Sequence, residues 1–122
     1  MSQEAPERPA EDLPLNAEIS SLVVRLTAEY TGRGPTKART TITNKVILVL
    51  LEDVLTKGER TLVRNGRAEH VARTRQIYQQ TMREEIVAGV EKLVGRKVTA
   101  FMSTNHVDPD MAAELFVLGD PL

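Results

Sequence analysis

The sequence contains no cysteine, and this absence removes several kinds of chemistry at once. Disulfide bonds, a thiol nucleophile and cysteine-ligated zinc are all excluded. Aromatic residues are scarce as well, with two tyrosines, two phenylalanines and no tryptophan among 122 residues. We therefore expect a core built mainly from valine, leucine and isoleucine, in a chain that is long enough to bury one.

Long hydrophobic stretches are also missing. No apolar run approaches the roughly 20 residues that a membrane-spanning helix needs, and the first residues lack the apolar segment of a secretory signal. We therefore expect a soluble, cytoplasmic protein. Residues 1–13, with two prolines and four acidic residues but little to bury, are predicted to form a disordered acidic leader. Residues 14–122 are predicted to form a single α+β domain.

The chain has no strong excess of charge of either sign. Sixteen basic residues stand against 17 acidic ones, for a formal net charge of −1. The first 18 residues carry five acidic side chains and one arginine, a net of −4, which leaves +3 for the rest. Sheets that bind RNA use exposed aromatic residues on a basic surface. Only two phenylalanines fall on predicted strands, so nucleic-acid binding is not expected.

The strongest pattern predicts one long helix over residues 67–94, closed by Gly95. Apolar residues recur along it at helical spacing, and Gly95 suits a left-handed cap. Gly89 lies on the apolar stripe, where a missing side chain lets another segment approach closely. Near the end of this helix, Val87, Val90 and Val94 are predicted to form a second apolar strip. We interpret that strip as a candidate homodimer surface.

Six further elements are predicted on either side of the long helix. Apolar periodicity indicates a helix over 17–31 and a short helix after residue 56, while β-type patterns indicate strands over 37–43, 46–51, 98–103 and 112–118. The resulting order is α-β-β-α-α-β-β, which predicts a four-stranded antiparallel sheet with helices on one face, an α+β two-layer sandwich. The unbroken apolar run Val46–Leu51 is typical of a strand buried on both faces. The helices can cover only one of these faces, so the run also favours a dimer.

Arg75 is unusual because it lies on the apolar stripe of the long helix. Its stem could pack while the guanidinium reaches water, or it could be a buried or interfacial arginine paired with a carboxylate. Glu59 is the candidate carboxylate for such a pair. Thr56 and Glu59 also have the spacing of a capping box, which gives both residues a structural role.

Two polar clusters could carry chemistry. The turn Gly32-Arg33-Gly34-Pro35, followed by Lys37 and Arg39, could cradle an anion. It follows a helix and leads into a strand, however, whereas phosphate loops usually precede a helix, so a simple connector is favoured. His106, Asp108 and Asp110 could ligate a metal or relay a proton, but their neighbours, Asn105 and Pro109, are typical of an ordinary turn. No nucleotide-binding, zinc-protease or catalytic-triad motif is present, so no enzyme activity, cofactor or metal is expected.

A set of short motifs in a fixed order resembles the MpsC-like family. The motifs are Tyr30-Thr31-Gly32-Arg33-Gly34-Pro35, Leu55-Thr56-Lys57-Gly58-Glu59, Leu93-Val94-Gly95-Arg96-Lys97-Val98 and Phe116-Val117-Leu118. This small bacterial domain is named after a subunit of a sodium-coupled, membrane-potential-generating system. The resemblance spans residues 17–118 and brings no catalytic or ligand residues. It implies a soluble cytoplasmic accessory protein that docks on a membrane complex.

Three functional hypotheses follow. The first is a non-enzymatic dimeric adaptor or regulatory protein that meets its partner through Arg75 and the basic part of the long helix. The second is a small-ligand or anion sensor that uses Arg33, Lys37 and Arg39. The third, which we favour least, is a metal-dependent enzyme at the His106 turn.

Overall fold

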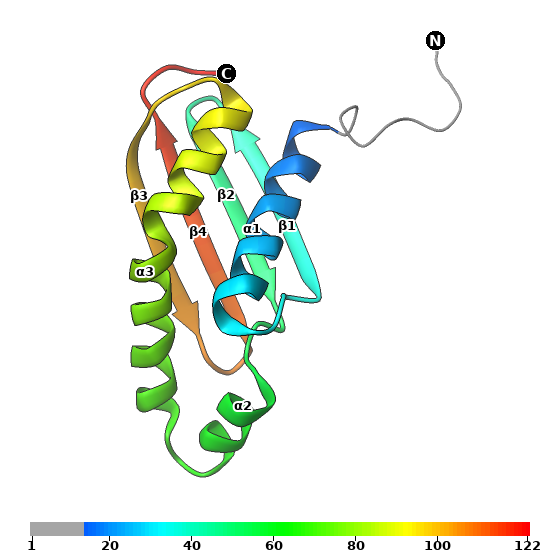
Figure 1. The fold of residues 1–122 in the computed structure, drawn as a ribbon, viewed down its shortest axis with the longest axis vertical. Helices are drawn as coiled ribbons and strands as arrows, with labels where there is room; N and C mark the ends of the chain where they lie inside the picture. Colours follow the sequence, from blue (N-terminus) through cyan, green and yellow to red (C-terminus); the bar gives the residue numbers. More distant parts are fainter. Residues whose placement is uncertain (1–13) are drawn as a thin grey trace, which may run out of the picture.

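The computed structural model describes residues 14–122 and places a four-stranded antiparallel sheet behind two long helices (Figure 1). The predicted leader, residues 1–13, lies outside the described residues. The order of the elements and the α+β fold agree with the prediction. The elements are α1 (Leu15–Thr31), β1 (Lys37–Thr43), β2 (Val46–Glu52), α2 (Lys57–Arg64), α3 (Ala68–Val94), β3 (Val98–His106) and β4 (Met111–Leu118).

The sheet consists of two hairpins joined along their inner strands. Its strand order is β1-β2-β4-β3, and every neighbouring pair is antiparallel. One prediction at the second hairpin was wrong, because residues 103–106 continue β3 instead of forming a turn. Asn105 and His106 pair with Ala112 and Met111, so the ladder to β4 outweighs the turn-like composition of this segment.

The helices α1 and α3 lie side by side on one face of the sheet (Figure 1). They approach each other closely at Gly89, where an added Cβ would lie 2.7 Å from a terminal methyl group of Leu22. The predicted close approach at this glycine is therefore confirmed. Gly95 ends α3 in the left-handed conformation, with φ of 68°, and its N–H donates to the carbonyl oxygen of Glu91.

The core lies between the helices and the sheet, and it corrects the predicted dimer strip. Val90 is fully buried and Val94 is buried, and both belong to the hydrophobic core. They continue the buried row of α3 at intervals of four residues from Ile86, so they point at the sheet rather than at solvent. Val87 alone of the three valines is half-buried, packed against the edge of the core. The prediction that these valines form a dimer surface was therefore wrong.

Candidate functional site

The sheet face opposite α1 and α3, here called the open face, is covered by none of the described elements (Figure 1). Every second residue of each strand points to it. Because residues paired across a ladder point to the same side, the register sorts these side chains into four rows of four. The rows are Thr43–Val46–Val117–Ala100, Thr41–Leu48–Leu115–Met102, Arg39–Leu50–Ala113–Thr104 and Lys37–Glu52–Met111–His106.

The centre of the open face is apolar. The two inner strands contribute only apolar side chains to it, apart from Glu52 at one end. Leu48 is 37 % exposed, Val46 38 % and Met102 51 %. An antiparallel sheet that faces water normally alternates between apolar inward and polar outward residues. Since β2 lacks this alternation, its unbroken apolar run leaves hydrophobic side chains uncovered in a single copy of the chain.

Polar residues border this apolar centre. The edge strand β1 contributes threonines and the basic residues Lys37 and Arg39, whereas Thr104 and His106 stand on the opposite edge strand. A hollow of about 340 Å³ lies toward the end of the sheet that carries His106, and its lining includes Leu50, Ala113, Thr104 and Met111. An apolar centre with a polar rim is the usual anatomy of a protein–protein contact. The open face therefore resembles a protein-binding surface more than a set of catalytic residues.

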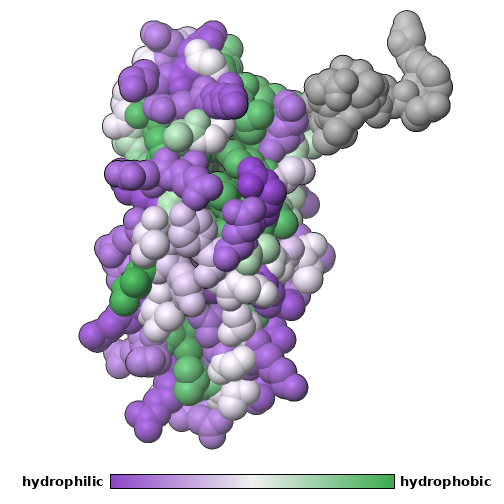
Figure 2. All heavy atoms as spheres, viewed as in Figure 1, coloured by the Kyte–Doolittle hydropathy of each residue, from purple (hydrophilic) through white to green (hydrophobic). Residues whose placement is uncertain are grey.

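The opposite side of the molecule has a different character. Viewed from the helices, the surface is mostly hydrophilic, and hydrophobic residues gather chiefly in the upper half, where α1 and α3 lie together (Figure 2). A groove there is lined by Leu22, Gly89 and Leu93 together with charged residues. Exposed hydrophobic residues also occur singly on this side, and Ile77 on α3 is 56 % exposed.

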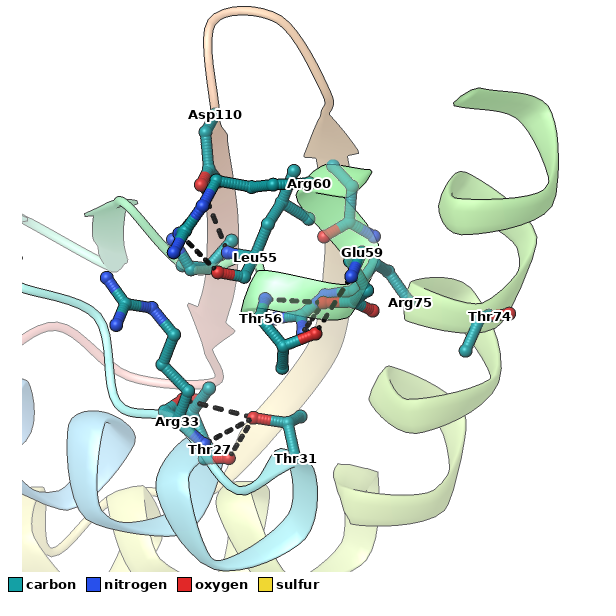
Figure 3. Close-up of polar contacts among 12 residues, drawn as sticks. Thr27, Thr31, Arg33, Leu55, Thr56, Glu59, Arg60, Thr74, Arg75 and Asp110 are labelled. Carbon is teal, nitrogen blue, oxygen red and sulfur yellow. Dashed lines mark hydrogen bonds and ion pairs between the residues drawn. The ribbon is translucent and has the colours of Figure 1, made fainter. Parts of the chain in front are cut away.

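Arg75 is buried beneath α2, where it pairs with Glu59 (Figure 3). The side chain is 4 % exposed, and its Nη1 donates to Glu59 Oε1 over 3.2 Å. Glu59 Oε1 also accepts from the N–H of Thr56, whose hydroxyl accepts from the N–H of Glu59, so the predicted capping box is confirmed. Of the two interpretations of Arg75, the buried pair is confirmed. Arg75 and Glu59 therefore hold α2 on α3, and neither is presented to a partner.

Glu114 is a second buried charged group, and it points from β4 into the space beneath α3. It accepts hydrogen bonds from Ser103 Oγ and from Gln79 Nε2, the latter over 3.5 Å. Gln79 and Asn105 exchange two further hydrogen bonds, of 2.8 and 3.2 Å. Burial raises the pKa of Glu114 to about 7, although the hydrogen bonds from Ser103 and Gln79 and the charge of Arg75 act to lower it. A carboxyl group poised near neutrality can bind or release a proton with the pH of its surroundings.

Asp110 holds together the loops at the end of the sheet nearest α2 (Figure 3). Its carboxylate accepts hydrogen bonds from the N–H groups of Val54 and Leu55, each over 3.0 Å, and its carbonyl accepts one from Asp53. Arg60 Nη1 donates a hydrogen bond of 2.8 Å to the carbonyl oxygen of Leu55. These contacts fix the segment that leads into α2.

The glycine-rich turn is engaged with its own neighbourhood. Gly32 caps α1 through its N–H, and Gly34 packs against Val24 and Ala28. Arg33 Nη2 donates to Asp53 Oδ2 over 2.6 Å, which lowers the pKa of Asp53. Lys37 and Arg39 lie on β1, and both point to the open face. The structure thus explains this turn as a connector, the favoured interpretation.

The His106 turn does not assemble a ligand set. His106 Nδ1 lies 2.9 Å from the carbonyl oxygen of Pro109, and Asp110 is occupied by backbone N–H groups. Among residues 14–122, no group of three or more histidines, cysteines or carboxylates stands close enough to hold a metal ion. The arrangement favours the structural interpretation of this turn.

A comparison with protein-family models matches the sequence of this chain to a known family. The model of the family described as "Na+-translocating membrane potential-generating system (MpsC)" matches residues 12–120, nearly the whole chain. The chain belongs to the MpsC family. No curated protein and no solved structure matches it. Membership links this MpsC chain to a sodium-translocating membrane system, and no helix within residues 14–122 is both long and apolar enough to cross a membrane.

Two features of this MpsC-family site were missed at the level of sequence. Glu114 interrupts the inward-facing row of β4, which otherwise consists of Ala112, Phe116 and Leu118. A charge at an inward position was a visible signal of a buried polar network, but its partners depend on the register of β3 against β4 and on the packing of α3 over the sheet. The open face was predicted only from β2, because the matching residues of β4 become its neighbours only through the strand order.

Proposed function

We propose that this chain is a non-enzymatic, cytoplasmic accessory component of a sodium-translocating membrane system, and that it acts by contacting protein through its open face. Family membership supports the link to such a system. The open face carries the proposal, because its exposed Leu48 and Met102 form a contiguous apolar surface with Leu115. Surfaces of this kind mark interaction sites in proteins that are otherwise water-soluble.

The polar residues support a structural rather than a catalytic role. Arg75 and Glu59 hold α2, and Asp110 holds the loop before it. A catalytic group needs free access to a substrate in a concave site. The most exposed basic residues near the open face, Lys37 and Arg39, lie at its rim, where charges chiefly steer and orient a partner.

The test uses cells that depend on the sodium-translocating system and lack this chain. Complementation with Leu48→Lys should fail to restore the sodium-dependent membrane potential, because a charge at the centre of the open face opposes docking. Ile77→Lys is the matched control, since it places the same charge at an exposed hydrophobic site on α3. Full restoration by Leu48→Lys, at equal protein level, would contradict the proposal.

A further inference from the structure

We infer that the occupant of the open face is a second copy of this chain, packed sheet against sheet as a two-fold symmetric dimer. The inference rests on the proposed function, because it names the protein that the open face contacts. Two stacked sheets keep their faces about 10 Å apart and interdigitate their side chains. In this arrangement β2 and β4 are buried on both sides, as the apolar run of β2 requires.

The size of the open face suits this occupant. Four strands about 4.8 Å apart, each with about seven paired residues, outline a footprint of roughly 19 by 24 Å. The accessible area of such a pleated surface exceeds its flat footprint of roughly 450 Å². It thus approaches the roughly 600 Å² per partner at the lower end of specific interfaces. A single helix, about 10–12 Å wide with its side chains, would cover only about half of this width.

The surface is also complementary to itself. Met102 on β3 is 51 % exposed, and a hollow whose lining includes Leu50, Ala113, Thr104 and His106 begins two residues further along the same strand. A two-fold axis within the interface gives each contact twice, so Met102 of each copy can enter the hollow of the other. A protrusion and a hollow on one face are what an isologous interface needs.

The charges of the open face agree with a second copy better than with a lipid surface. Its centre is uncharged, and Lys37 and Glu52 are direct neighbours across the β1–β2 ladder at one end. Two copies can therefore meet without burying a charge at the centre. Membrane surfaces are usually bound through clustered basic residues and interfacial tryptophan or tyrosine. None of the sixteen outward positions of the four strands is a tryptophan, a tyrosine or a phenylalanine.

Light scattering of the purified protein across a concentration series tests the inference. The wild-type chain and Ile77→Lys should show twice the single-chain mass of 13.5 kDa. Leu48→Lys and Met102→Lys should show the single mass, with the helical circular dichroism of the wild type retained. A wild-type protein that stays a single copy, or one that grows beyond two copies, would overturn the inference. The inference would also be overturned if Leu48→Lys and Met102→Lys both showed the mass of two copies.

Cross-linking provides a test that needs no charged substitution. The absence of cysteine allows one reactive thiol to be placed at a time. Met102→Cys protein mixed with Ala113→Cys protein should form a covalent dimer with a short bismaleimide. Met102→Cys mixed with Ile77→Cys should not form one. Equal yields in the two mixtures would overturn the proposed face even if a dimer exists.

The outcomes separate the two proposals. In one outcome, the wild type is a single copy and Leu48→Lys still fails to restore the membrane potential in cells. This outcome would overturn the dimer and leave the proposed function standing. A single-copy wild type that floats with phospholipid vesicles would overturn the second copy in favour of a lipid surface. In another outcome, Leu48→Lys dissociates the dimer but fully restores the membrane potential. This outcome would support the dimer and contradict the proposed function.

Discussion

Arg75 on α3 and Glu59 on α2 form a buried ion pair whose Nη1 and Oε1 atoms lie 3.2 Å apart. The pair joins the first half of the long helix to a short helix that has no buried residue of its own. The same carboxylate caps α2 by accepting from the N–H of Thr56. One glutamate thus starts α2 and attaches it, which is why α2 keeps its place with little hydrophobic contact.

Replacement of Arg75 by alanine should strongly destabilise the protein. Removal of one partner from a buried pair leaves an uncompensated charge on Glu59, at a cost of about 3–5 kcal/mol. Urea denaturation followed by circular dichroism measures this loss, and Arg73→Ala on the exposed side of α3 is the matched control. Equal midpoints for the two variants would contradict the role of the pair. A folded Arg75→Ala protein should retain the mass of the wild type, because Arg75 does not reach the surface.

The raised pKa of Glu114 predicts a pH dependence of stability. The folded chain binds the proton with a pKa of about 7, against an ordinary value of 4.5, so it holds more protons than the unfolded chain between these values. The stability that the protonated group contributes is therefore fully present below pH 4.5 and is lost as the pH rises through 7. The free energy of unfolding should fall by up to about 3 kcal/mol over this range.

Glu114→Gln isolates this effect, because glutamine keeps the shape of the side chain without its charge. The variant should match the wild type near pH 4.5 and be more stable at pH 8, as measured by urea denaturation at each pH. Glu84→Gln, at an exposed position of α3, should follow the wild-type curve. A difference between Glu114→Gln and the wild type that does not change with pH would exclude the proton-binding role.

Asp110 predicts a second local weakness. Asp110→Ala leaves the N–H groups of Val54 and Leu55 without their acceptor, and each buried unsatisfied group costs about 1–3 kcal/mol. Hydrogen exchange should accelerate at these two amides, and the melting temperature should fall. Asp108→Ala, two residues away and exposed, is the control and should change neither. If both variants behave alike, the carboxylate of Asp110 is not the clamp that the geometry indicates.

The sequence allowed much of the fold to be predicted, because most of its signals are local. Helical periodicity, the cap at Gly95 and the Thr56–Glu59 box each depend on residues within one or two turns of one another. The errors arose where contacts between elements decide the outcome. The pairing with β4 extends β3 to His106, and the sheet buries Val90 and Val94.

The candidate surface was predictable only in part for the same reason. The apolar run of β2 indicated that the sheet needs a second cover, but it could not show which residues share that face with Leu48. The strand order decides this, since it brings Leu115 beside Leu48 and Met102 beside Leu115. The partners of Arg75 and Glu114 also differ. Arg75 has one carboxylate partner, Glu59, and this pair was predicted, whereas the network around Glu114 joins β3, β4 and α3 and was not.

The contact between Gly89 and Leu22 gives a prediction in which two effects oppose each other. Alanine is favoured over glycine by about 1 kcal/mol inside a helix, but its Cβ would lie 2.7 Å from a Leu22 methyl group. The obstructing methyl group is the far end of a half-buried side chain, so it can move aside at a small cost. Gly89→Ala should therefore change the stability of the wild-type protein by less than about 1 kcal/mol.

Leu22→Ala removes the obstructing methyl groups, so Gly89→Ala should be more stabilising in that background than in the wild type. A double-mutant cycle by urea denaturation measures this difference as a coupling energy between α1 and α3. Gly58→Ala is the control, because a Cβ there meets only the hydroxyl of Thr56 at 4.0 Å. Gly58→Ala should change the free energy of unfolding by the same amount in the wild type and in Leu22→Ala. Additive effects of Gly89→Ala and Leu22→Ala would show that the two helices do not depend on this contact for their spacing.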